Sequence, residues 1–539
     1  MSSAVQHKAL PRTAAPEDAG VSSREVLAFL DDVQGADLEL HSFMVLRRGH
    51  VAAECFFAPF TAGDNHQMWS VSKSVTATAV GIAIGEGLLT LNTRLLDIFP
   101  EYRPKRPDEN LERLTVRDLV SMRSGKSPPY LSPKGDKADW LRKYVAAPWY
   151  NTPGTEFRYI NENFYVLCAI LTRVTGQSVI EYLTPRLFEP LGIERPFWET
   201  DAHGIESGGW GFYAKTEDLA KLILCYEQCG KFNGRQVIPA EWAREATRQQ
   251  TPCVGLHTST NHGYGYGFWM NPLPDSYRAN GMFCQFGIAF PAWDGIFVCN
   301  ASVTDEETVH QLAWKHFPKA FIDEAEETVP GFAARLHEAR FEEAPPVSEH
   351  SELEAEIAGK TIRLRRKQLL RLINFPVGIL PAIVTAKTHA KSAQINNIVL
   401  HFDENSCRFA WREGAEQNEV SCGMDGSRRE GYITLGGVGY RTLSHAVWED
   451  KNTLLVQIRA AETIACQRLR FRFRGGSRVT LQSKSTPPME HIIGFLTDGA
   501  VFLFKNPVVL KALRWVLGLL PRVVEPVHHG RVRQRQIEY

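Results

Sequence analysis

The stretch from Met68 to Leu91 reads MWSVSKSVTATAVGIAIGEGLLTL and places a serine, Ser70, three residues before a lysine, Lys73, at the start of a run of small and apolar residues. Such a run predicts a helix that is buried on all sides. A buried ammonium group is costly unless it is paired or loses its proton. Lys73 therefore either points to water or is held beside Ser70 for chemistry.

Three residues make almost one helical turn, so a helix that begins at Ser70 would place Lys73 on the same face, below the serine oxygen. A neutral lysine there can accept the hydroxyl proton, and burial lowers the pKa of a lysine towards the value that a base needs near neutral pH. The SxxK spacing alone is a weak signal, because a serine and a lysine three residues apart occur by chance in most chains of this length.

The surrounding sequence predicts an α+β fold. HSFMVLRRGHVAAECFF (41–57) has the pattern of two strands joined at Arg-Arg-Gly-His, and strand patterns return at 264–270, 285–290 and 295–302. Helical patterns lie between them, and another precedes them, where Ser22 and Glu25 have the spacing of a capping box. We expect one antiparallel sheet assembled from both ends, with a helical part inserted.

A second motif makes the SxxK spacing specific. Residues 153–161 read PGTEFRYIN, which gives a YxN pair, and further phrases follow the order of a known family. These phrases are PEDAGVS, the 41–57 hairpin, SVSK, LTVRDLVSMRSG, PGTEFRYIN and YGYGFW. On these motifs the chain, over about residues 10–320, resembles the serine beta-lactamase-related family. That family includes class C beta-lactamases, D-alanyl-D-alanine carboxypeptidases, family VIII esterases and 6-aminohexanoate-dimer hydrolases, and implies a beta-lactamase/transpeptidase-like fold.

The resemblance implies a role for each motif residue. Ser70 would be the nucleophile that becomes acylated, while Lys73 and Tyr159 would remove its proton and deliver it to the leaving group. A phenol has an unperturbed pKa of about 10 and is a poor base alone, so the lysine and the tyrosine form one coupled titration. The amide of Asn161 would orient Lys73 or the substrate carbonyl.

The third family motif, a KTG strand, is altered in this chain. Its place is taken by YRANGMFCQFGIAFP (277–291), where Ala279, Asn280 and Gly281 stand for KTG, with a register open to one or two residues. No lysine or histidine occupies the first position, although Arg278 is adjacent. Because that lysine would hold a substrate carboxylate, we expect Asn280 and Gly281 to contact a different substrate.

Two further features of the site are expected, and the first of them follows from the resemblance. The oxyanion hole would be formed by the backbone N–H groups of Ser70 and Met282, which do not depend on a KTG side chain. Tryptophans flank the motifs and either line the pocket or belong to ordinary packing: Trp69, Trp149, Trp210 and Trp269.

Composition excludes several function classes. Lysine plus arginine and aspartate plus glutamate both number 61 in 539 residues, so no excess charge favours nucleic acid. The ten cysteines form no CxxC pair and no zinc spacing, so we expect no metal and no cofactor. Scattered thiols, an N-terminus without a signal-type apolar core and the absence of any apolar run of about 18 residues together predict a cytoplasmic protein without a transmembrane segment.

The chain is expected to contain two domains. Acidic residues and a double proline at 323–358 predict a linker between a serine hydrolase domain at 1–322 and a β-rich domain at 359–539, in the form of a meander or small barrel. An apparent hairpin at 396–411 supports the β assignment. The amphipathic segment Ile492–Leu520 would either dock on the protein or contact a membrane surface peripherally. The oligomeric state stays open.

The sequence therefore predicts an enzyme that cleaves a small-molecule ester or amide through an acyl-enzyme. An esterase or amidase is favoured over a beta-lactamase. The alternatives are an acyltransferase that uses the same acyl-enzyme, a D-Ala peptidase or beta-lactamase, and a catalytically silent relative that binds peptides.

Overall fold

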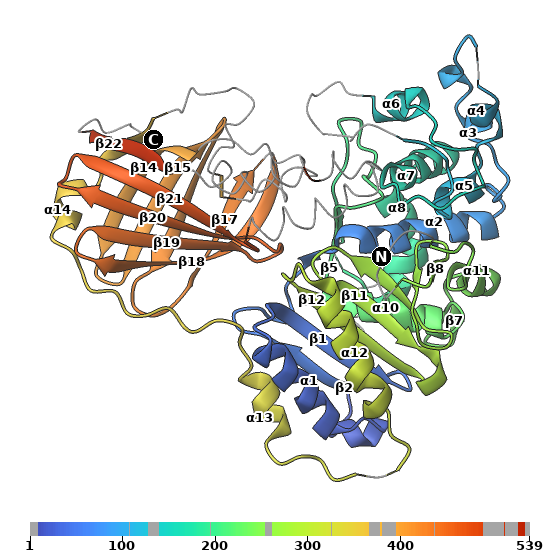
Figure 1. Ribbon diagram of the computed structural model, residues 1–539, viewed down its shortest axis with the longest axis horizontal. Coiled ribbons are helices and arrows are strands. Elements are labelled where there is room, and N and C mark those ends of the chain that lie inside the picture. The colour runs from blue at the N-terminus through green and yellow to red at the C-terminus, as the bar shows by residue number, and fades with distance from the viewer. Residues whose placement is uncertain are drawn as a thin grey trace, which may run out of the picture. The chain divides into compact units, whose positions relative to one another are not determined.

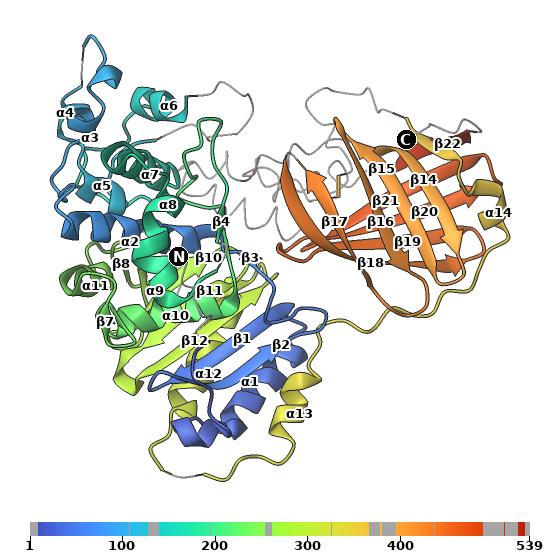
Figure 2. The same ribbon diagram turned by 180° about the vertical axis from the view of Figure 1, so that it is seen from behind.

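The computed structural model describes residues 9–106, 108–127, 139–194, 196–253, 261–324, 326–365, 378–379, 395–435, 437–488, 511 and 527–533. The chain forms two compact units, Met1–Phe341 and Glu342–Tyr539 (Figures 1 and 2). The boundary falls inside the segment expected to be a linker.

The first unit is built on a seven-stranded antiparallel sheet with the strand order β2-β1-β12-β11-β10-β9-β8. The N-terminal hairpin thus lies beside the last strand of the unit, which confirms a sheet assembled from both ends. The segment 264–270 supplies parts of two short paired strands and not one strand. The strands are β1 (Leu40–Arg47), β2 (His50–Phe56), β8 (Gly263–Tyr264), β9 (Trp269–Met270), β10 (Tyr277–Gly281), β11 (Gln285–Phe290) and β12 (Gly295–Ala301).

Both faces of this sheet are covered, as the alternation of β1 shows. Phe43 and Val45 pack on one side with α1 (Ser23–Gly35) and α12 (Glu306–Ala320). Met44 and Leu46 pack on the other side, in the core that contains α2 (Ser72–Gly85) and α10 (Thr216–Glu227). Successive side chains of a strand point to opposite faces, so an eight-residue strand that is buried throughout requires two apolar layers.

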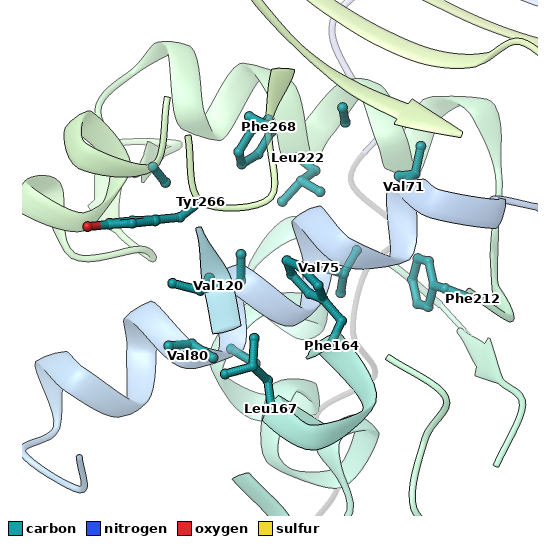
Figure 3. Close-up of a cluster of buried hydrophobic side chains, with 14 of the residues drawn as sticks. Val71, Val75, Val80, Val120, Phe164, Leu167, Phe212, Leu222, Tyr266 and Phe268 are labelled. Carbon is teal, nitrogen blue, oxygen red and sulfur yellow. The ribbon is translucent and has the colours of Figure 1, made fainter. Parts of the chain in front are cut away.

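The helix after the SxxK motif, α2 (Ser72–Gly85), is buried from Ser72 to Ala83. Figure 3 shows Val75 and Val80 of this helix among Phe164, Leu167 and other side chains of the surrounding elements. Close neighbours explain its small residues, because a Cβ at Gly81 would lie 2.2 Å from the Trp242 ring.

The remaining helices of the first unit surround α2 or cover the sheet. They are α3 (Leu95–Ile98), α4 (Glu109–Arg113), α5 (Val116–Val120), α6 (Trp140–Ala146), α7 (Glu162–Thr175), α8 (Val179–Leu183), α9 (Glu189–Leu191), α10 (Thr216–Glu227), α11 (Ala240–Ala246) and α13 (Phe332–His337). Short strands complete the unit: β3 (His66–Gln67), β4 (Phe197–Trp198), β5 (Phe212–Ala214), β6 (Lys231–Phe232) and β7 (Arg235–Gln236).

The capping box expected before α1 does not form. Ser22 donates its hydroxyl hydrogen bond to Glu326, and the carboxylate of Glu25 contacts His316 on α12. The helix still begins at Ser23, so partners distant in sequence replace the local ones.

The second unit is a ten-stranded sheet that closes through a pairing of β16 with β18. Its elements are α14 (Leu353–Ile357), β13 (Thr361–Leu364), β14 (Ile395–Asp403), β15 (Ser406–Glu413), β16 (Glu416–Gly423), β17 (Arg429–Leu435), β18 (Val438–Asp450), β19 (Thr453–Ala460), β20 (Cys466–Arg474), β21 (Arg478–Thr486) and β22 (His528–Arg533). The antiparallel β character of this unit agrees with the expected fold class.

The expected amphipathic segment Ile492–Leu520 lies, except for Lys511, outside the described residues. Where the chain is described, no single helix has both the length and the apolar composition to cross a membrane, and the bent pair Glu162–Thr175 and Val179–Leu191 reaches them only when taken together.

Candidate active site

Ser70 lies in a tight turn at the entrance to α2. The 3-10 turn Trp69–Val71 precedes the helix, which begins two residues later than expected. Trp69 has a φ of 47°, a left-handed conformation that is uncommon for a residue with a side chain. The Ser72 hydroxyl fixes this turn, because it donates to the Trp69 carbonyl at 2.6 Å and accepts from the Phe212 amide at 3.1 Å.

The buried lysine is held against the serine. Lys73 is 1% exposed, and its Nζ donates to Ser70 Oγ at 2.8 Å, to Asn161 Oδ1 at 2.7 Å and to the carbonyl oxygen of Gly209 at 2.7 Å. An ammonium group has three N–H donors, so these three acceptors match it one for one. Ser70, Lys73 and Asn161, which the motifs singled out, therefore meet in the folded chain.

Gly209 was not among the residues predicted for the site, since a backbone carbonyl has no side-chain signature. The glycine pair is the signal that points to it. A Cβ at Gly209 would lie 2.5 Å from the Asn161 carbonyl oxygen, and one at Gly208 would lie 2.2 Å from that of Phe164. Only glycine lets this loop approach closely enough to present its carbonyl to Lys73.

Tyr159 packs against the Lys73 ammonium group with its ring. The Lys73 Nζ lies 4.7 Å from the centre of the tyrosine ring, which stacks on Trp269 at 5.3 Å. Burial raises the pKa of Tyr159 well above its ordinary value, and a hydrogen bond with the Ser70 side chain acts in the opposite direction. The phenol group is therefore protonated at neutral pH.

The end of β10 lies against the nucleophile turn. A Cβ at Gly281 would be 2.3 Å from the Met68 carbonyl oxygen, and the Phe283 ring meets the Trp69 ring at 5.2 Å, edge to face. Met282, whose N–H was expected to donate to an oxyanion, is partly exposed between these two contacts.

The turn that follows is strained and firmly held. Phe283 and Cys284 have φ values of 64° and 66°, which side-chain-bearing residues rarely adopt. The fully buried Gln285 side chain donates to the carbonyls of Phe283 at 3.1 Å and Ala301 at 2.7 Å, and accepts from Asn300 at 2.9 Å. Gln285 thus ties the turn to β12.

The polar residues of β10 form a chain that reaches α12. Arg278, 2% exposed, donates from Nε to Asn280 Oδ1 at 2.8 Å and from its other nitrogens to Asn261 and Asn271. Asn280 donates in turn to Glu306 Oε2 at 3.3 Å. Burial lowers the pKa of Arg278 to about 10 and raises that of Glu306 to about 7. Glu306 was not predicted, and an isolated glutamate at a helix start carries no signal for a site.

Two of the four flanking tryptophans, Trp69 and Trp269, touch the site. Trp149 instead lies under the Lys126 ammonium at 3.7 Å, and Trp210 packs on Trp140 at 5.9 Å. Within the described ranges no group of three or more histidine, cysteine or acidic side chains has the arrangement of a metal site.

Known proteins are similar to this chain. A family model described as Beta-lactamase matches residues 37–314. The 6-aminohexanoate-dimer hydrolase of Paenarthrobacter ureafaciens is 28% identical over 279 residues, which cover 44% of this chain and 70% of the relative. Penicillin-binding protein 4 of Amycolatopsis lactamdurans is 31% identical over 170 residues, which cover 30% of this chain and 42% of that one.

A solved structure of a penicillin-binding protein homologue from Caulobacter crescentus is similar to the chain with a TM-score of 0.45 and 19% identity, over 55% of this chain and 99% of that one.

Proposed function

Because the chain belongs to the beta-lactamase family, we propose that it is a serine hydrolase in which an ester or amide acylates Ser70 and water then releases the acyl group. The observation that carries this proposal is the 2.8 Å contact between Lys73 Nζ and Ser70 Oγ, made by a buried lysine whose other two acceptors are fixed.

The acceptors around Lys73 define the proton path. A neutral lysine keeps two N–H groups, which the Asn161 and Gly209 oxygens accept, so its lone pair faces the Ser70 hydroxyl. In that state Lys73 removes the proton as Ser70 attacks the carbonyl carbon. Tyr159, protonated and next to both side chains, passes a proton to the leaving group, and Lys73 and Tyr159 act as one unit.

The oxyanion that forms on the attacked carbonyl needs donors close to Ser70. We assign them to the backbone N–H groups of Ser70 and Met282. The approach of Gly281 to the Met68 carbonyl and the ring contact between Phe283 and Trp69 support this assignment, since both hold Met282 beside the nucleophile turn.

The substrate is proposed to be a short-chain ester, or an amide of a small acid, that has no carboxylate near the bond that is cut. Penicillins and D-Ala-D-Ala peptides carry a carboxylate near the bond that is cut, and a charge-assisted hydrogen bond to it is worth roughly 1.5–3 kcal/mol. Ala279 has no cation to offer, the Arg278 guanidinium is covered by asparagine side chains, and Asn280 is bonded to a carboxylate. An acyltransferase remains the second candidate, because the same acyl-enzyme serves it.

The experiment compares p-nitrophenyl acetate and butyrate with nitrocefin and a D-Ala-D-Ala peptide, for the wild type and Ser70→Ala. We expect kcat/KM for the esters to exceed that for nitrocefin, and Ser70→Ala to lose turnover. Intact-mass detection of an acyl group on Ser70 excludes a silent peptide-binding protein, and product analysis with an added amine or alcohol identifies acyl transfer. A nitrocefin value equal to the ester value would overturn the substrate assignment.

We further propose that the first unit holds the whole active site, that the protein acts on small molecules and not on nucleic acid, and that it is cytoplasmic. The state of the cysteines supports the last point, because all ten are free thiols.

A further inference from the structure

A carboxylate lies at the end of the strand where the family motif places a lysine. Glu306, in the first turn of α12, accepts from the Phe283 amide with Oε1 at 3.0 Å and from Asn280 with Oε2 at 3.3 Å. Phe283 meets Trp69, the neighbour of Ser70, so one side chain separates Glu306 from the nucleophile turn. The negative charge also acts on Tyr159, whose pKa it helps to raise.

The chemistry of the three side chains fixes the direction of each hydrogen bond from Arg278 through Asn280 to Glu306. Arg278 can only donate, and an ionised Glu306 can only accept, so the amide of Asn280 must turn its oxygen to the arginine and its nitrogen to the glutamate. The Arg278 cation therefore stands at the inner end of this series of hydrogen bonds, and the Glu306 carboxylate stands at its outer end.

Exposure decides which charge a substrate meets. Arg278 is 2% exposed, whereas the Asn280 and Glu306 residues are partly exposed. A carboxylate oxygen accepts about two hydrogen bonds, and Glu306 accepts one on each oxygen, from Phe283 and from Asn280, so each oxygen can accept one more donor. The outer end of β10 is therefore an acceptor of protons and positive charge.

We propose that Glu306 determines specificity for substrates that carry an ammonium group near the ester or amide bond that Ser70 attacks. The acyl group of such a substrate lies along the end of β10, and its ammonium donates to the Glu306 carboxylate. This inference rests on the proposed serine hydrolase function and names the substrate class of the same site. Glu306 would also repel a substrate that carries a carboxylate, which already lacks the lysine of the family motif as a partner.

The test uses three p-nitrophenyl esters whose acyl chains differ only at their end: β-alanyl with an ammonium, butyryl with a methyl and succinyl with a carboxylate. The assay is run at pH 8, where a carboxyl group with a pKa of about 7 is ionised. A charge-assisted hydrogen bond at a partly exposed site predicts a kcat/KM about tenfold higher for β-alanyl than for butyryl, and lower for succinyl than for butyryl.

Glu306→Gln keeps the size of the side chain and removes its charge, so the ratio of β-alanyl to butyryl should fall to within about twofold of unity. The ratio is the readout because Glu306 also accepts the Phe283 amide, and a disturbed turn lowers all three rates together. Glu307→Gln is the matched control, since it removes the same charge from the next residue, whose carboxylate accepts from Gln311. It should keep the wild-type ratio.

Three outcomes contradict the inference. If wild-type protein prefers butyryl over β-alanyl, or if Glu306→Gln keeps the wild-type ratio, Glu306 does not select the substrate, while acylation of Ser70 by the butyryl ester still upholds the hydrolase. If intact mass shows no acylation of Ser70 by any of the esters, both the hydrolase and the specificity are overturned.

Discussion

Replacing Gly281 with alanine adds one methyl group at the place where β10 approaches the nucleophile turn. The new Cβ would lie 2.3 Å from the Met68 carbonyl oxygen and 3.0 Å from the Gln285 Cβ. The first of these atoms belongs to the backbone and cannot rotate away. β10 and the turn that carries Ser70 must therefore separate by about 1 Å to reach ordinary contact, a shift that small-to-large substitutions in packed sites impose.

This separation should affect catalysis more than stability. Overpacking typically costs about 1–3 kcal/mol of unfolding free energy. A displacement of about 1 Å between the nucleophile and the groups that complete the site lowers the rate by about a hundredfold. We expect Gly281→Ala to fold, with a lower urea midpoint, and to lose about two orders of magnitude in kcat for p-nitrophenyl butyrate.

Gly287→Ala provides the control within the same sheet. Its Cβ would meet the Ile223 side chain at 2.6 Å, on the face that packs against α10. It should lower stability by a similar amount with little change in kcat when both variants are assayed well below their unfolding transitions. If the kcat of Gly281→Ala stays within about threefold of that of Gly287→Ala, and not about a hundredfold below it, then the end of β10 does not border the reacting group.

Three further predictions concern the proton path, a buried carboxyl group and the boundary between the two units. Lys73→Ala and Tyr159→Phe should each lower kcat strongly, and the double variant should be little worse than either, because groups that act as a unit are not additive; losses that multiply contradict a shared proton path. Burial raises the pKa of Glu199 to about 8, so between about pH 5 and 8 the folded protein keeps a proton there that the unfolded chain has lost. The free energy of unfolding should therefore fall as pH rises through this range, by up to about 1.4 kcal/mol per pH unit. Urea midpoints across this range should flatten in Glu199→Gln, and an unchanged slope would exclude the site. A fragment that ends at Phe341 should keep Ser70 reactive towards an ester probe in intact-mass assays, and a folded but unreactive fragment would show that the second unit helps to build the site.

The parts of the fold that could be predicted from sequence rest on periodicity and order. The 41–57 hairpin and the other strands of the antiparallel sheet have strand-like patterns, and a continuous run of small and apolar residues marks the buried helix after Ser70. The contact between Lys73 and Ser70 also follows from helical spacing, even though the helix begins at Ser72, because a 3-10 turn continues into it with nearly the same side-chain direction.

The parts that could not be predicted depend on partners far away in sequence. The Gly209 carbonyl accepts from Lys73 because the loop backbone comes close to the lysine, and no residue type in a sequence indicates that its main-chain carbonyl will be an acceptor. Ser22 and Glu25 have the local spacing of a capping box, but both side chains bind residues about 300 positions later. The position of Glu306 requires the register of β10 and the start of α12 together, which only the folded chain provides.

The order of the strands has a consequence for synthesis of the protein. β1 pairs with β2 on one side and with β12 on the other, and β12 ends at Ala301. A ribosome that adds about 5–20 residues per second leaves the nascent hairpin without its second neighbour for roughly 10–50 s. During that interval β1, whose eight residues are all buried in the finished fold, presents an unpaired apolar edge. Gly281, where β10 meets the nucleophile turn, belongs to the same late segment, so we expect the newly made chain to need protection from aggregation until almost the whole first unit has been synthesised.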